Sequence, residues 1–137
     1  MVNTLCKIYS NLEDCGVSVF DCHMVANKSI CSMDGYIGID ARTMTSTEEC
    51  TTLMHENGHF ISGAFYLPYS KYIIKEQAEY KADKAAILKY IPKDEISACT
   101  DNGNTELWQL AEHFNVTEDF MLKAILYYKE QELALSN

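Results

Sequence analysis

Two histidines one helical turn apart are the residues of this chain best suited to metal chemistry. His55 and His59 stand in the segment HENGH, and Glu56 directly follows the first of them. Residues at i and i+4 lie on one face of a helix, so both imidazoles can reach one ion at about 2.0–2.1 Å. Glu56 lies beside that face, where a carboxylate can take a proton from water at the metal without binding the metal itself. The spacing therefore predicts a zinc site with Glu56 as the catalytic base.

A hydrolytic zinc site needs a third protein ligand from another element, and acidic residues further along the chain offer one. Glu79 follows His59 by twenty residues, and Asp83 lies one helical turn after Glu79. We expect Glu79 to bind the metal and Asp83 to accept a hydrogen bond from the non-ligating nitrogen of a zinc-bound histidine. Glu76, one turn earlier, is an alternative ligand, and direct ligation by Asp83 is another.

Helices are expected for the segments that carry these residues. Ser46, with Glu49 three residues later, can form a capping box that opens a helix running to about Gly63. A second helix is expected over 75–90, because Pro92 cannot continue it. The apolar spacing also favours helices over 3–14, 105–114 and 117–133.

Short segments rich in β-branched and aromatic residues precede the first histidine and favour strands, over 17–23, 28–33 and 36–40. Asp34-Gly35 suits the two positive-φ positions of a type I′ turn between the last two strands. We therefore expect a small antiparallel sheet packed with the histidine-bearing helix and further helices. This is an α+β fold, and the 137 residues are expected to form a single domain, 1–137.

Composition and charge exclude several classes of function. The chain is 47% hydrophobic and carries a net charge of −9, so it can bury a core but repels phosphate backbones and anionic lipid. The six cysteines form no Cys-x-x-Cys pair and are expected to be reduced. No apolar run is long enough to span a bilayer, and the N-terminus does not read as a signal peptide. A cytoplasmic protein that contacts neither membrane nor nucleic acid directly is expected.

The segment from Leu110 to Thr117 resembles the turn of a helix-turn-helix. Residues 100–137 carry seven acidic residues against two lysines, however, so the cations that bind phosphates are missing. A helical hairpin that covers the sheet is the expected structure.

The order of these motifs resembles the ImmA/IrrE family of small gluzincin metallopeptidases. The matching segments are YIGID (36–40), HENGH (55–59), EYKAD (79–83), Pro92 and LAEHFNVT (110–117). The match covers about residues 35–126. It departs at Asn57, where the family often has a bulky apolar residue, and near Ala85, where the family has an aromatic one.

The resemblance implies a zincin-like fold and a zinc-dependent endopeptidase. Its protein substrate would be a helix-turn-helix repressor that controls a phage or other mobile element. The strand 36–40 would then form the sheet edge along which an extended substrate pairs. A Tyr or His would stabilise the oxyanion, and the candidates are Tyr66, Tyr69, Tyr72, Tyr80, His23 and His113. The alternative is a catalytically silent regulatory binding module that retains the metal.

Overall fold

The computed structural model describes residues 4–25 and 27–135 and confirms the α+β class, with six helices and a three-stranded sheet. The elements are α1 (Thr4–Asp14), β1 (Ser18–Asp21), β2 (Ser29–Ser32), β3 (Tyr36–Ile39), α2 (Ser46–Ser62), α3 (Tyr72–Tyr90), α4 (Lys93–Asp101), α5 (Leu107–Phe114) and α6 (Glu118–Leu135). The sequence did not predict α4. The first residue of the helix expected over 3–14 lies outside the described part of the chain.

The sheet is mixed, so the prediction of an antiparallel sheet is wrong in part. Its order is β1-β3-β2, and β3 pairs in parallel with β1 and antiparallel with β2. The connection after β1 passes the end of β3, where the Cys22 amide donates to the Ile39 carbonyl at 2.9 Å and the Asp40 amide donates to the Lys28 carbonyl at 2.8 Å. This path leaves β3 in the centre. The expectation that strand 36–40 is an edge is therefore also wrong, and β2 forms the edge instead.

The turn between β2 and β3 has three residues rather than two. Ser32 pairs with Tyr36 across the hairpin, and the Gly35 amide donates to the Ser32 carbonyl at 3.0 Å. Gly35 has φ 96°, whereas Asp34 is not in the positive-φ region. A loop of three residues closed by a left-handed glycine is a common hairpin alternative to the type I′ turn.

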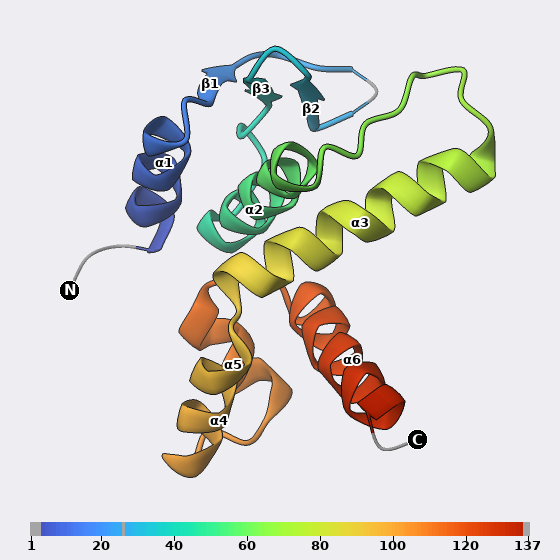
Figure 1. Ribbon diagram of the computed structural model, residues 1–137. Helices are drawn as coiled ribbons and strands as arrows, with labels where there is room; N and C mark the ends of the chain where they lie inside the picture. The colour runs from blue at the N-terminus through green and yellow to red at the C-terminus, as the bar shows by residue number, and fades with distance from the viewer. Residues whose placement is uncertain (1–3, 26, 136–137) are drawn as a thin grey trace.

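Helix α2 lies between the sheet and the long helix α3 (Figure 1). Its capping box uses Thr45 and Glu48, one residue before the predicted pair, and Gly63 ends it with φ 69°. Leu53 is completely buried and Asn57 is 1% exposed, so the helix has little free surface in its middle. His55, Glu56 and His59 therefore lie on a helix that is covered on both sides in its middle.

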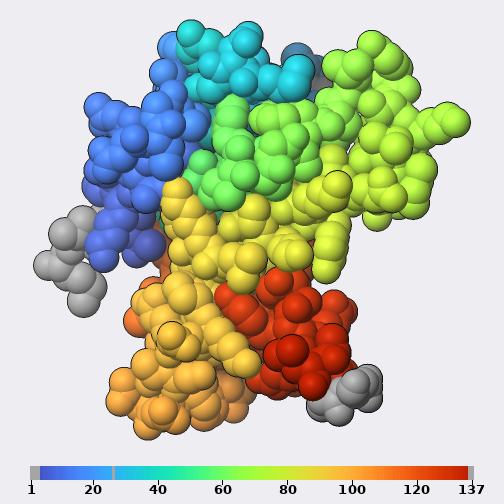
Figure 2. Space-filling model, in the orientation of Figure 1, coloured from blue at the N-terminus to red at the C-terminus, as the bar shows by residue number. Residues whose placement is uncertain are grey.

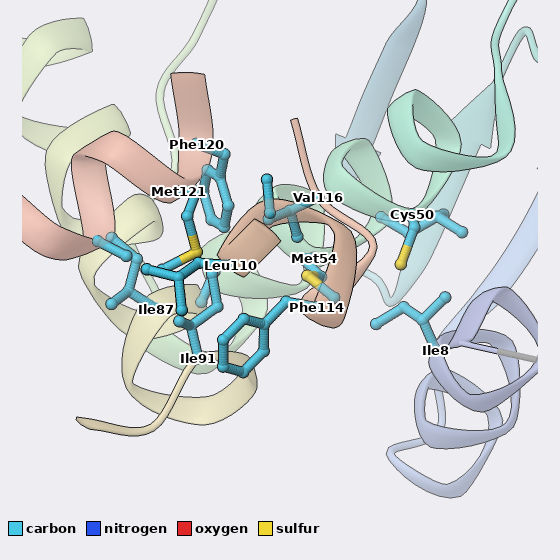
Figure 3. Close-up of a cluster of buried hydrophobic side chains, with 14 of the residues drawn as sticks. Ile8, Cys50, Met54, Ile87, Ile91, Leu110, Phe114, Val116, Phe120 and Met121 are labelled. Atoms are coloured by element: carbon cyan, nitrogen blue, oxygen red, sulfur yellow. The ribbon is translucent and has the colours of Figure 1, made fainter. Parts of the chain in front are cut away.

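The core runs from α1 through α2 to the C-terminal helices (Figure 3). Two hydrogen bonds join the turn between α5 and α6 to α2. The Thr47 hydroxyl donates to the Asn115 side chain at 2.8 Å, and the Thr117 amide donates to the Thr51 hydroxyl at 3.0 Å. The hairpin of α5 and α6 packs beside α2 and α3 rather than over the sheet, contrary to the expectation. On the face seen in Figure 2, α3 lies between α1, the sheet and α2 on one side and α4 and α6 on the other.

Two further observations concern the whole described chain. All six cysteines are free thiols, as expected, and Cys50 and Cys99 are buried in the core. Among the helices of the described residues, none combines the length and the apolar character needed to cross a membrane.

Candidate metal centre

The two histidines of α2 each have one ring nitrogen engaged by a fixed acceptor. Nδ1 of His55 lies 2.7 Å from Oδ1 of Asp83, and Nδ1 of His59 lies 2.7 Å from the carbonyl oxygen of Ala64. A carbonyl can only accept, so His59 donates from Nδ1, and Nε2 of its neutral ring carries a lone pair. The carboxylate of Asp83 favours the same tautomer for His55. Both Nε2 atoms are thereby left to bind something else.

Glu79 of α3 faces both of these free nitrogens. Its Oε2 lies 2.7 Å from Nε2 of His55, and its Oε1 lies 3.3 Å from Nε2 of His59. One ligand atom from each of the three residues falls within 4.8 Å of the others. The structure therefore brings together the three predicted ligands, and this group could hold a metal ion.

The rival ligands stand elsewhere. Glu76 is exposed, and the Tyr72 hydroxyl donates a hydrogen bond to it, which raises the pKa of Tyr72. Asp83 meets His55 at the nitrogen opposite the one that faces Glu79. The geometry thus favours Glu79 as third ligand and gives Asp83 the orienting position.

The donor set fits a cation. With Nδ1 protonated on both rings, the contact of each Nε2 with an oxygen of Glu79 is favourable only when a positive charge lies there, either a second proton on the ring or a metal ion. Burial lowers the pKa of His55, but hydrogen bonds to Asp83 and Glu79 outweigh it and raise that pKa to about 10. The same contacts with His55 and His59 hold the pKa of Glu79 well below its usual range. Two imidazole nitrogens and a carboxylate oxygen are ligands that divalent ions of intermediate softness accept.

Glu56 is buried beside the ligands and turned toward the sheet. Ser29 of β2 donates its hydroxyl to Oε1 of Glu56 at 2.8 Å. The thiol of Cys31, also on β2, donates to the same carboxylate, and burial followed by the charge of Glu56 raises the pKa of that thiol well above its ordinary value. These two donors hold the Glu56 carboxylate in one place next to His59, as a positioned base requires.

The loop after α2 supplies an aromatic wall. The ring of Phe65 stacks near His59 with centroids 6.0 Å apart, and the ring of Tyr66 meets His59 edge-on at 6.3 Å. The Tyr66 hydroxyl donates to Glu79, and burial together with that contact raises its pKa to about 12, so it remains a donor at neutral pH. Of the proposed oxyanion donors, Tyr66 is therefore the one with a contact to the ligand group. The others are exposed or paired elsewhere: Tyr69, Tyr72, Tyr80, His23 and His113.

Close packing of two helices brings the ligands together. A Cβ atom built on Gly58 would lie 2.0 Å from the carbonyl oxygen of Ala82. Gly58 stands between the two histidines, and Ala82 stands between Glu79 and Asp83. The bare glycine thus permits the approach of α2 and α3 that closes the group of ligands.

The site is open to solvent. Two surface hollows of about 370 Å³ each are both lined by Glu79, Asp83 and Lys123. One of them continues past His55 to Ser29 on β2. The ligand group is therefore reached from solvent beside Ser29 of the edge strand.

Several residues that contact the candidate metal site belong to no sequence motif that could have identified them. Ser29 and Cys31 lie on a separate strand, and the acceptor for His59 is a backbone carbonyl. Lys123 of α6 pairs with Oδ2 of Asp83 at 3.2 Å, across forty residues.

Comparison with known proteins adds no assignment, since no protein-family model, no curated sequence and no solved structure matches this chain.

Proposed function

We propose that this protein is a zinc-dependent endopeptidase of the gluzincin type. The observation that carries the proposal is that three of four neighbouring side chains are placed to bind a metal ion, whereas the fourth, a carboxylate, is not. His55, His59 and Glu79 direct ligand atoms to a common point, while Glu56 lies beside them and is held by other donors. A purely structural site has no use for a buried carboxylate that does not bind the metal.

The chain's own residues fit the steps of peptide hydrolysis. When bound by these ligands, Zn²⁺ would supply Lewis-acid polarisation of the scissile carbonyl and of water. Glu56 takes the proton from the attacking water and delivers it to the leaving amine. Tyr66 donates a hydrogen bond toward the oxyanion, and Asp83 keeps His55 in the tautomer and orientation that ligation needs.

The substrate is best described as an extended protein segment. Strand β2 pairs with β3 on one side only, so within the described residues its other edge has free backbone donors and acceptors beside Glu56. An extended peptide can add to such an edge as a further strand. The resemblance to the ImmA/IrrE family supports a helix-turn-helix repressor of a phage or other mobile element as the protein that supplies this segment.

The test replaces Glu56 by Gln and leaves the ligands in place. Gln is nearly isosteric and still accepts the Ser29 hydrogen bond, so we expect normal folding and one zinc per chain. Cleavage should fall at least about 10²–10⁴-fold, because an amide cannot accept the proton. Wild type and variant are co-expressed with candidate repressors encoded nearby, and a discrete cleavage product is sought. Glu76→Gln is the matched control, since Glu76 is exposed outside the ligand group, and it should cleave normally.

Two outcomes contradict the proposal. Cleavage that survives in Glu56→Gln removes Glu56 from the mechanism. Binding of a repressor by the wild type without any cleavage, in the zinc-loaded state, favours the silent binding module instead.

A further inference from the structure

A third element contributes a possible metal ligand that the proposed mechanism does not use. Cys31 pairs with Ile37 across the hairpin, so its side chain lies on the inner face of the sheet with that buried residue. Ligand atoms of Cys31, Glu56 and His59 all fall within 4.8 Å of one another. The thiol therefore stands at the same histidine that belongs to the His55, His59 and Glu79 group.

The two overlapping groups share one ligand atom. Nδ1 of His59 is taken by the Ala64 carbonyl, so Nε2 is the atom that His59 can offer to an ion in either group. A single imidazole nitrogen binds one ion. The two groups therefore belong to one metal site. Cys31 approaches that site from the sheet, and Glu79 approaches it from α3.

We propose that Cys31 acts as a fourth ligand to the ion held by His55, His59 and Glu79 and so closes the site in a latent state. This inference rests on the proposed function. Zinc prefers four ligands in a tetrahedron, with sulfur at about 2.3 Å and nitrogen at about 2.0–2.1 Å, so neighbouring ligand atoms lie roughly 3.5 Å apart. In the structure the Cys31 sulfur has a ligand atom of His59 within 4.8 Å, so Cys31 reaches this arrangement from the side of His59, by rotation of its side chain toward the ion.

The ligand exchange is balanced by the release of one proton. The S–H bond of Cys31 breaks, its proton passes to solvent water, and a bond forms between sulfur and the ion. The closed state has four protein ligands, so it lacks a place for water at the ion. Displacement of the sulfur by water, with uptake of a proton by Cys31, opens the site.

Protection of the thiol by zinc tests the inference without any substrate. The purified full chain is treated with excess iodoacetamide before and after one equivalent of Zn²⁺, at an alkaline pH and for long enough that Cys31 reacts measurably without metal, and alkylation of each cysteine is followed by peptide mass spectrometry. A metal-bound thiolate is not free to attack, so alkylation of Cys31 should slow by more than about tenfold. Cys22 is the matched control, because its sulfur lies by Gly38 on the opposite face of the sheet, and its rate should not change.

Substitution with Co²⁺ separates ligation from simple shielding. The Co²⁺ form should show a sulfur-to-cobalt charge-transfer band in the near ultraviolet, and Cys31→Ser should lose this band while it keeps one ion per chain. Protection of Cys31 without the band overturns the inference, as does an unchanged alkylation rate in protein that binds one zinc. Absence of zinc binding by the wild type overturns the proposed function as well, so the two failures are distinguishable.

Discussion

Replacement of Gly58 by Ala should damage the metal site and the packing of α2 on α3 at the same time. The added Cβ atom would lie 2.0 Å from the Ala82 carbonyl oxygen and 2.8 Å from its carbonyl carbon. Cβ atoms are essentially never found closer than 3.0 Å to such atoms, so the two helices must separate by about 1 Å. The obstacle is backbone on both sides, and no side-chain rotation relieves it.

The expected change in the free energy of unfolding is the difference between a stabilising and a destabilising effect of the Gly58→Ala substitution. Alanine stabilises a helix interior by about 1 kcal/mol relative to glycine, whereas overpacking a close contact costs typically about 1–3 kcal/mol. A contact with rigid backbone belongs at the upper end, so the free energy of unfolding should fall by about 1–2 kcal/mol. Metal sites tolerate about 0.2 Å of error in ligand distances. A shift of about 1 Å between the histidines on α2 and Glu79 on α3 should therefore weaken zinc binding by more than about 100-fold.

Two measurements separate these effects. Urea unfolding in the presence of a chelator reports the packing cost alone, and competition with a chromogenic zinc chelator reports affinity. Ile61→Ala, at a half-exposed position of the same helix, is the control and should leave both values nearly unchanged. Adding Ala82→Gly to Gly58→Ala should not restore zinc binding, because the obstacle is the carbonyl oxygen. Wild-type stability and affinity in Gly58→Ala would refute this account of the helix contact.

Three further predictions concern polar contacts, two of them on α3 and one between β3 and α2. Asp83→Asn should bind zinc about 10–100-fold more weakly, measured by the same competition, because the histidine that it orients loses a charged partner. Tyr90→Phe should lower the free energy of unfolding by about 1–3 kcal/mol in urea, since the buried amide of Asn57 loses its acceptor. The hydrogen bond from Arg42 holds the pKa of Asp40 well below its usual range, so this carboxylate stabilises the fold above about pH 4 and loses that effect as the pH falls. Asp40→Asn should accordingly be less stable than wild type at pH 6, with the difference shrinking toward pH 2 in unfolding experiments.

The helical part of the site could be predicted because its signals are local. The i, i+4 spacing of His55 and His59, and of Glu79 and Asp83, places each pair on one face of its helix whatever the rest of the chain does. The predicted start of α2 differs from the observed one by a single residue. Two neighbouring pairs of residues can each form a capping box, and the local sequence does not select Thr45 over Ser46.

The sheet was harder to predict because strand order depends on contacts between distant segments. Alternating residues and a glycine turn indicate a hairpin, and β2 and β3 form one. They do not indicate that β1 joins β3 in parallel, which needs the connection after β1 to pass the end of β3 before β2 begins. The hydrogen bonds that fix this path join Cys22 to Ile39 and Lys28 to Asp40, and no periodicity in the sequence indicates them.

The position of β2 decides how the site could be controlled. With β3 in the centre, the residues that reach Glu56 come from the edge strand, where Ser29 and Cys31 stand two apart and point to one face. A peptide that pairs with this edge would lie directly beside both side chains. Occupation of the edge by substrate and release of Cys31 from the ion would then be coupled, since each requires the same strand to adjust. Extended peptides that bind β2 should therefore increase the alkylation of Cys31 in the zinc-loaded protein, and an unchanged rate in the presence of a bound peptide would show that the two events are independent.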